Sequence, residues 1–289
     1  MSNRTKPLFG PAGNSESFYA AGFKRTVEAP AWLAGIGLDA YEYQCGNGVR
    51  GNEESFRAIG KEAEIYGISM SLHAPYYISL SGVELEKRLK SIEYIQKSID
   101  AAAWLGADII VVHTGSAAKI SREQAMDYAR DTLYKTLCEI KNPAGVRIGL
   151  ETMGKLNQLG TIDEVIDLCK IGDILCPVID FGHVNARNVG GFFRTADDYK
   201  AVFDKIGDKL GDNYAQNLHC HFSKIEFTDK GEKKHLTFAD TIYGPPYVPL
   251  AEAISEYSLS PRIICESDGT QADDALTLKK CTFGQSLSR

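Results

Sequence analysis

Short apolar segments alternate with longer amphipathic segments along almost the whole chain. Eight of the apolar segments are short, and many are rich in β-branched residues, as in strands buried on both faces of a parallel sheet. They cover residues 7–11, 38–44, 68–73, 107–113, 146–151, 176–180, 217–222 and 262–266. The pattern therefore predicts strands that are separated by helical segments.

The segments between these strands have helical spacing. Apolar residues recur at i, i+3 and i+4 over residues 84–105, and a second amphipathic stretch covers residues 122–140. Ser121 can cap the second stretch through its side chain. Thr161 and Glu164 have the spacing of a capping box, which predicts the start of a third helix.

Eight strands that are each followed by helical sequence make up the count of an α/β (β/α)8 barrel, the TIM barrel. A doubly wound open sheet is the alternative, but it usually has fewer strands and a glycine-rich nucleotide loop. Neither G-x-G-x-x-G nor G-x-x-x-x-G-K-[ST] follows a predicted strand here. Since no linker, low-complexity tract or repeat interrupts the chain, the sequence predicts one barrel domain over residues 1–289.

Composition and charge narrow the class of protein. A chain of 289 residues that is 44% hydrophobic can bury a large core. The net charge of −6 argues against a protein that coats nucleic acid, although it permits a local basic rim. The sequence contains neither an 18-residue apolar run nor a basic-then-apolar leader, so we expect no membrane span and no secretory signal. The seven cysteines include no C-x-x-C pair, and Cys176, Cys220 and Cys265 lie inside predicted strands, which favours buried thiols in a reducing cytoplasm.

Every histidine of the chain falls at or just after a predicted strand. The six are His73, His113, His183, His219, His221 and His235, and the carboxylates Glu151, Asp180 and Glu266 share their segments or neighbourhood. In a (β/α)8 barrel, residues at the C-terminal ends of the strands face the substrate. Imidazole and carboxylate without thiolate suit zinc, manganese or iron in an open site. The sequence therefore predicts a metal site at the C-terminal ends of the barrel strands.

Individual positions support this site to different degrees. His219 and His221 lie two residues apart on one strand, so both can face the barrel mouth. Glu151 and Glu266 each follow apolar sequence, where an unpaired charge is costly, so each needs a cationic partner. A single histidine at a strand end is more often an ordinary hydrogen-bonded residue, and this interpretation is favoured for His221 or His235 taken alone.

Seven short segments, taken in order, resemble the endonuclease IV family of apurinic/apyrimidinic endonucleases, within the xylose-isomerase-like barrels. They are HAPY at 73–76, VVHTGS at 111–116, GLETMGK at 149–155, IDFGH at 179–183, LHCHFSK at 218–224, GEKKH at 231–235 and ICES at 264–267. The resemblance implies a DNA repair endonuclease that hydrolyses the phosphodiester 5′ to abasic sites in double-stranded DNA. It also implies a hydroxide held by two or three metal ions, which we expect to be Zn²⁺, with Mn²⁺ or iron as alternatives.

The resemblance also assigns roles to residues. It implies three ligand sets, which are His73, His113 and Glu151, then Glu151, Asp180, His219 and Glu266, and then His183 and His235. Glu151 would bridge two of the ions and is the expected catalytic residue. Tyr76 matches a position that contacts DNA at the lesion, and Arg50 in the loop GNGVRG is a further candidate for DNA contact.

This chain departs from the family pattern in the motifs GEKKH and LHCHFSK. The family usually has an aspartate two residues before the histidine that corresponds to His235, and here Lys233 stands there. Glu232 or Glu226 could supply the missing carboxylate. His221 stands where the family leads us to expect a polar residue other than histidine, and it could also compensate.

The main alternative is a sugar isomerase or epimerase of the same superfamily. One metal would then be held by Glu151, Asp180, His219 and Glu266, with two carboxylates acting as acid and base on a ketose. That function leaves the ligands of the other two sets without a common task. A non-catalytic DNA- or metal-binding protein is a third alternative. We expect the nuclease, and we expect a monomer because the family's site is open to a long duplex.

Overall fold

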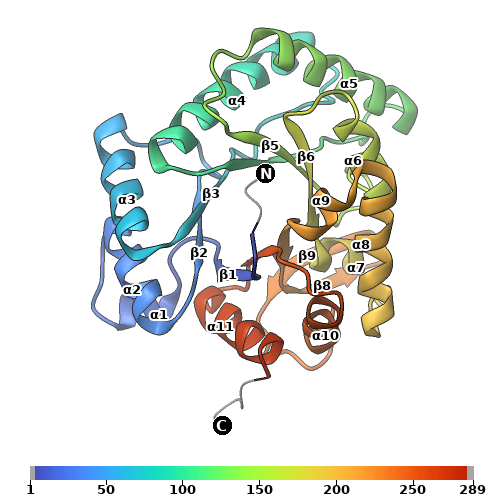
Figure 1. The fold of residues 1–289 in the computed structure, drawn as a ribbon. Coiled ribbons are helices and arrows are strands. Elements are labelled where there is room, and N and C mark those ends of the chain that lie inside the picture. The colour runs from blue at the N-terminus through green and yellow to red at the C-terminus, as the bar shows by residue number, and fades with distance from the viewer. Residues whose placement is uncertain (1–3, 285–289) are drawn as a thin grey trace.

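In the computed structural model, which describes residues 4–284, eight parallel strands surround the centre of the molecule and helices form the outer layer (Figure 1). The strands are β1 Leu8–Pro11, β2 Ala40–Gln44, β3 Ser69–His73, β4 Ile109–His113, β5 Arg147–Glu151, β6 Leu175–Asp180, β7 His219–Phe222 and β10 Arg262–Cys265. Each strand overlaps one of the predicted apolar segments. The predicted (β/α)8 barrel is therefore confirmed.

The outer layer follows the predicted amphipathic segments. Its helices are α1 Glu16–Ala20, the 3-10 turn Thr26–Glu28, α2 Ala29–Ile36, α3 Glu53–Tyr66, α4 Leu85–Leu105, α5 Arg122–Glu139, α6 Ile162–Cys169, α7 Phe181–Arg187, α8 Ala196–Leu210, α9 Asp212–Gln216, α10 Val248–Glu256 and α11 Gln271–Thr282. The Ser121 hydroxyl accepts from the Gln124 amide at 3.1 Å, and Thr161 with Glu164 forms the expected capping box. The helix starts are thus set by local side-chain chemistry.

The barrel closes between β1 and β2 through a seam that differs from the other strand pairs. The remaining neighbours form continuous ladders in the order β1-β10-β7-β6-β5-β4-β3-β2. Across the seam, the Asp39 amide donates to the Phe9 carbonyl and the Gly13 amide donates to the Glu42 carbonyl, both at 2.9 Å. The backbones approach closely here, since a Cβ at Gly10 would lie 1.8 Å from the Ala40 carbonyl oxygen.

Side chains that alternate along the strands form two apolar regions. Leu72, Val112 and Leu150 point outward and pack against the helices. Inside the barrel, Ile109, Val111, Cys176 and Val178 form a separate buried cluster. None of the helices among residues 4–284 is long and apolar enough to cross a membrane.

The segment after β7 contains a hairpin that is not among the strands predicted from the sequence. Strands β8 Lys224–Thr228 and β9 Gly231–Leu236 pair antiparallel, and the register shifts between Glu226 and Phe227. Gly231 has φ 89° and lies so close to the loop after β5 that a Cβ would be 2.2 Å from the Gly154 carbonyl oxygen. This contact places the hairpin beside the C-terminal ends of β5 and β6.

Candidate metal centre

Glu151, the last residue of β5, lies at the centre of the candidate site. Its side chain is 1% exposed, and Oε2 is 3.5 Å from Nε2 of His73 and 3.3 Å from Nε2 of His113. Its other oxygen, Oε1, is 3.0 Å from Nδ1 of His221. The carboxylate therefore contacts ligand atoms on two sides, which is the arrangement that a bridging ligand requires.

The first group of possible ligands consists of His73, His113 and Glu151. His73 and His113 end the neighbouring strands β3 and β4, so the barrel itself brings their rings together, with centroids 5.1 Å apart. Nδ1 of His73 is 2.8 Å from the Ala74 carbonyl, which can only accept a hydrogen bond. Nδ1 therefore carries a proton, and Nε2, on the side of Glu151, is the nitrogen that would bind a metal.

The second group consists of Glu151, Asp180, His221 and Glu266, whose ligand atoms lie within 4.8 Å of one another. Oδ1 of Asp180 accepts from the His183 amide at 2.8 Å and so caps α7. Oδ2 of Asp180 and Oε2 of Glu151 are buried and have no hydrogen-bond partner among the described residues. Buried carboxylate oxygens of this kind are costly unless a further group satisfies them. The site therefore fits divalent cations.

The third group consists of His183, Glu232 and His235. His183 donates from Nδ1 to the Thr152 carbonyl at 3.0 Å, and its Nε2 lies 3.5 Å from Oε2 of Glu232. Nδ1 of His235 is 2.8 Å from the Ser223 hydroxyl. Helix α7 thus supplies one ligand and the hairpin supplies the other two.

The hairpin register explains how a carboxylate is present although Lys233 stands at the family's aspartate position. Lys233 is directed outward, with a side chain that is 57% exposed, and it pairs with Glu226 at 2.6 Å. Glu232 instead reaches the third group. The register shift in the hairpin directs its side chain away from the outward pair that Lys233 forms with Glu226. Of the two carboxylates considered from the sequence, the structure places Glu232 in the site and Glu226 outside it.

This placement gives a first prediction. Glu232→Gln should lower the metal content by about one ion per chain, because an amide is a poorer ligand for zinc-like metals than a carboxylate. Glu226→Gln removes a carboxylate from the same hairpin and should leave the content unchanged. Plasma emission spectrometry on both dialysed variants tests this, and equal metal contents would contradict the assignment of Glu232.

The structure places His219 apart from the three groups above, together with Glu42 and His221. In the strand register His221 pairs with Asp180, whereas His219 pairs with Val178, two residues nearer the N-terminal end of the barrel. His219 accepts from Nε of Arg262 at 2.9 Å and contacts Glu42 at 3.0 Å, so it lies below the ligand groups. His221 occupies the place that the resemblance gave to His219.

Glu42 is a site residue that the sequence analysis missed. It lies on β2, is fully buried, and contacts both His219 and His221 at 3.0 Å. It belongs to none of the seven family motifs. The available signal was an acidic residue within a predicted strand, at a position that alternation directs into the barrel.

The charges in the site compensate one another. Burial would raise the pKa of Glu151, but His221 and the other nearby imidazoles hold it well below its usual range. Burial lowers the pKa of His113 to about 3, which keeps this ring neutral and available as a ligand. Burial also opposes the charge of His183, but Asp180 and neighbouring carboxylates outweigh it and raise the pKa to about 9. A metal at the third group would therefore displace a proton from His183.

Two adjoining hollows lead from these groups to the solvent. One, of about 400 Å³, is lined by the ligand groups, and the other, of about 560 Å³, is lined by Arg50 and by amide side chains. Tyr76 lines both hollows, is 57% exposed, and has its ring centroid 5.3 Å from that of His113. A Cβ at Gly46 would be 2.3 Å from the Tyr76 ring, so glycine permits this close packing. Both residues expected to contact DNA thus lie at the mouth of the site.

Comparison with known families and sequences gives one family match and several similar proteins. The family described as "Xylose isomerase-like TIM barrel" matches residues 30–281. An uncharacterized protein of Methanocaldococcus jannaschii is 31% identical over 252 residues, which cover 86% of this chain and 89% of that protein. A probable endonuclease 4 of Acholeplasma laidlawii is 29% identical over 176 residues, which cover 60% of this chain and 59% of that protein. The match thus spans about three fifths of that endonuclease.

Solved structures with the same fold include proteins of different activities. A D-tagatose 3-epimerase-like protein superimposes with a TM-score of 0.68 at 20% identity, over 96% of each chain. Endonuclease IV from Thermus thermophilus gives a TM-score of 0.63 at 18% identity, over 96% of this chain and 98% of that one. At these identities the likeness shows a common barrel and leaves the reaction open.

Proposed function

Because the chain belongs to the xylose isomerase-like TIM barrel family, we propose that it is a metal-dependent endonuclease that hydrolyses DNA on the 5′ side of abasic sites. One observation carries this proposal. The buried carboxylate of Glu151 joins two ligand groups, and a third group lies next to them. Several adjacent cations suit phosphodiester hydrolysis, in which charge on the attacking and leaving oxygens must be stabilised.

The ligand groups would hold two or three ions. The sets are His73, His113 and Glu151, then Glu151, Asp180, His221 and Glu266, and then His183, Glu232 and His235. Their mixture of imidazole and carboxylate favours Zn²⁺, with Mn²⁺ or iron as alternatives. When bound, such ions act as Lewis acids on the phosphate and lower the pKa of water.

The rim of the site supplies the contacts that would select DNA. Arg50 can donate to a phosphate, and the exposed ring of Tyr76 can pack against the nucleotide at the lesion. An abasic nucleotide leaves the helical stack at low cost, and the hollow of about 560 Å³ beside the ligand groups can receive it. The sequence identity to proteins called probable endonuclease 4 supports abasic DNA as the substrate. We further expect a monomer that acts in the cytoplasm.

A single-metal sugar epimerase is the second candidate. Glu151, Asp180, His221 and Glu266 alone form a complete four-ligand set, and two of these carboxylates could transfer protons on a ketose. Under this function His73, His113 and the third group would have no common role. The nuclease accounts for all three groups and is therefore preferred.

Metal content and cleavage together test the proposal. We expect about three transition ions per chain in protein purified without chelators, and metal-dependent nicking of a duplex that carries one abasic site. An undamaged duplex of the same sequence is the matched control. One ion per chain together with turnover of a ketose, and no nicking of the abasic duplex, would replace the nuclease with the epimerase.

A further inference from the structure

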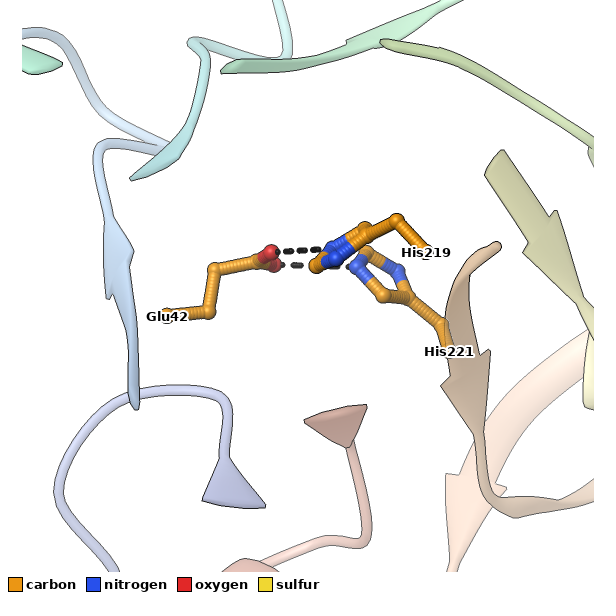
Figure 2. A group of neighbouring side chains, drawn as sticks. All are labelled: Glu42, His219 and His221. Carbon is orange, nitrogen blue, oxygen red and sulfur yellow. Dashed lines mark hydrogen bonds and ion pairs between the residues drawn. The ribbon is translucent and has the colours of Figure 1, made fainter. Parts of the chain in front are cut away.

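Glu42 connects two histidines of β7 across the interior of the barrel. Figure 2 shows its side chain directed at both His219 and His221. Oε2 accepts from the Ser71 hydroxyl at 2.9 Å and lies 3.0 Å from Nε2 of His219. Oε1 lies 3.0 Å from Nε2 of His221 and accepts from the Gln44 amide at 3.3 Å. All four neighbours can donate, so this buried carboxylate acts as an acceptor throughout.

The tautomer of His219 follows from its other neighbour. Nε of Arg262 is 2.9 Å from Nδ1 of His219, and a guanidinium can only donate. Nδ1 is therefore the acceptor, and the ring proton is on Nε2, directed at Glu42. Arg262 is itself fixed by Asp108 at 2.7 Å and by the Ser69 hydroxyl at 2.8 Å. His219 thus has no lone pair free for a metal, and it orients Glu42 instead.

His221 stands between Glu42 and the second ligand group. Its Nδ1 is hydrogen-bonded to Oε1 of Glu151 at 3.0 Å and lies 3.4 Å from Glu266, so a metal bound at the second group would take the place of the proton on this nitrogen. Its Nε2 is buried and has no regular hydrogen bond among the described residues. Oε1 of Glu42, at 3.0 Å, is the acceptor within reach of that nitrogen.

We propose that Glu42 is a positioning residue for the metal centre. It holds His221 with the proton on Nε2, so that Nδ1 presents its lone pair to the second metal, while His219 and Arg262 hold Glu42 in place. Carboxylates that accept from the remote nitrogen of a ligating histidine fix its tautomer and raise its basicity. The inference rests on the proposed metal centre and not on the proposed DNA substrate.

Glu42→Gln tests this role in the full-length protein. The amide keeps one acceptor oxygen, and its NH₂ group would face a histidine or serine donor. Zinc affinity, measured by competition with a chromophoric chelator, should weaken for one ion by about 10- to 100-fold. Glu226→Gln, which changes a carboxylate outside the site, should match the wild type. Zinc affinity of Glu42→Gln within twofold of the wild type would overturn the proposal.

A spectroscopic signature separates positioning from a general loss of packing. In the zinc-loaded wild type, ¹⁵N NMR should show a proton on Nε2 of His221 and none on Nδ1, and Glu42→Gln should lose this distinct tautomer. A wild-type proton on Nδ1 would overturn the proposal.

A second variant keeps the test available if Glu42→Gln does not fold. Ser71→Ala removes one hydrogen bond to Glu42 and should weaken one zinc site by about fivefold. An unchanged zinc affinity of Ser71→Ala would also overturn the proposal. Because no assay uses DNA, the absence of nuclease activity leaves this test intact.

Discussion

Glu151→Gln should lower cleavage of an abasic duplex by about 1000-fold or more, which is the largest effect on activity that we expect. Glu151 contacts ligand atoms of two groups, so losing one charged oxygen disturbs two metal positions together. Metal stabilisation of a phosphate transition state contributes several kcal/mol, and each 1.36 kcal/mol is a factor of ten in rate. Initial rates on an end-labelled duplex at saturating zinc provide the measurement.

The control for Glu151→Gln must separate chemistry from folding. Glutamine has nearly the same volume, so the circular dichroism spectrum of the variant should retain the wild-type secondary structure. Glu226→Gln makes the same chemical change outside the ligand groups and should retain cleavage. Near-normal cleavage by Glu151→Gln would exclude Glu151 as the central ligand, and with it the proposed nuclease site.

The barrel could be predicted because its signals are local. Strand 146–151 and the observed β5, Arg147–Glu151, differ by one residue, since a short apolar run flanked by helical sequence is sufficient to define it. The start of α6 was equally accessible, because Thr161 and Glu164 form their capping box within one turn. Patterns of this kind depend on neighbours in the sequence and are little affected by the rest of the fold.

The depth of a residue along the barrel could not be predicted in this way. Alternation places His219 and His221 on the same face of β7, and only the pairing of His221 with Asp180 shows which ring reaches the ligand groups. The choice between Glu232 and Glu226 stayed open for a similar reason, because it depends on a register shift inside the hairpin. Both outcomes depend on how strands pair with one another, which motif spacing does not encode.

Gly10→Ala should cause the largest loss of stability. The new Cβ would lie 1.8 Å from the carbonyl oxygen of Ala40, and this oxygen is backbone that cannot rotate away. The clash falls on the β1–β2 seam, where the ladder is weakest and where Glu42 follows on β2. We expect the free energy of unfolding to fall by about 3 kcal/mol or more, at the upper end of overpacking effects. Urea titration followed by circular dichroism measures this change.

Gly35→Ala is the matched control for the seam. Gly35 lies in the helix α2, and a Cβ there would meet nothing within 4 Å, so the same chemical change carries no steric cost. Because alanine favours the helix more than glycine does, the substitution should raise the free energy of unfolding by up to about 1 kcal/mol. Opposite signs for the two variants would show that close approach at the β1–β2 seam, and not glycine removal in general, limits the stability of the barrel. Equal small effects would show that the seam tolerates displacement of β1 from β2.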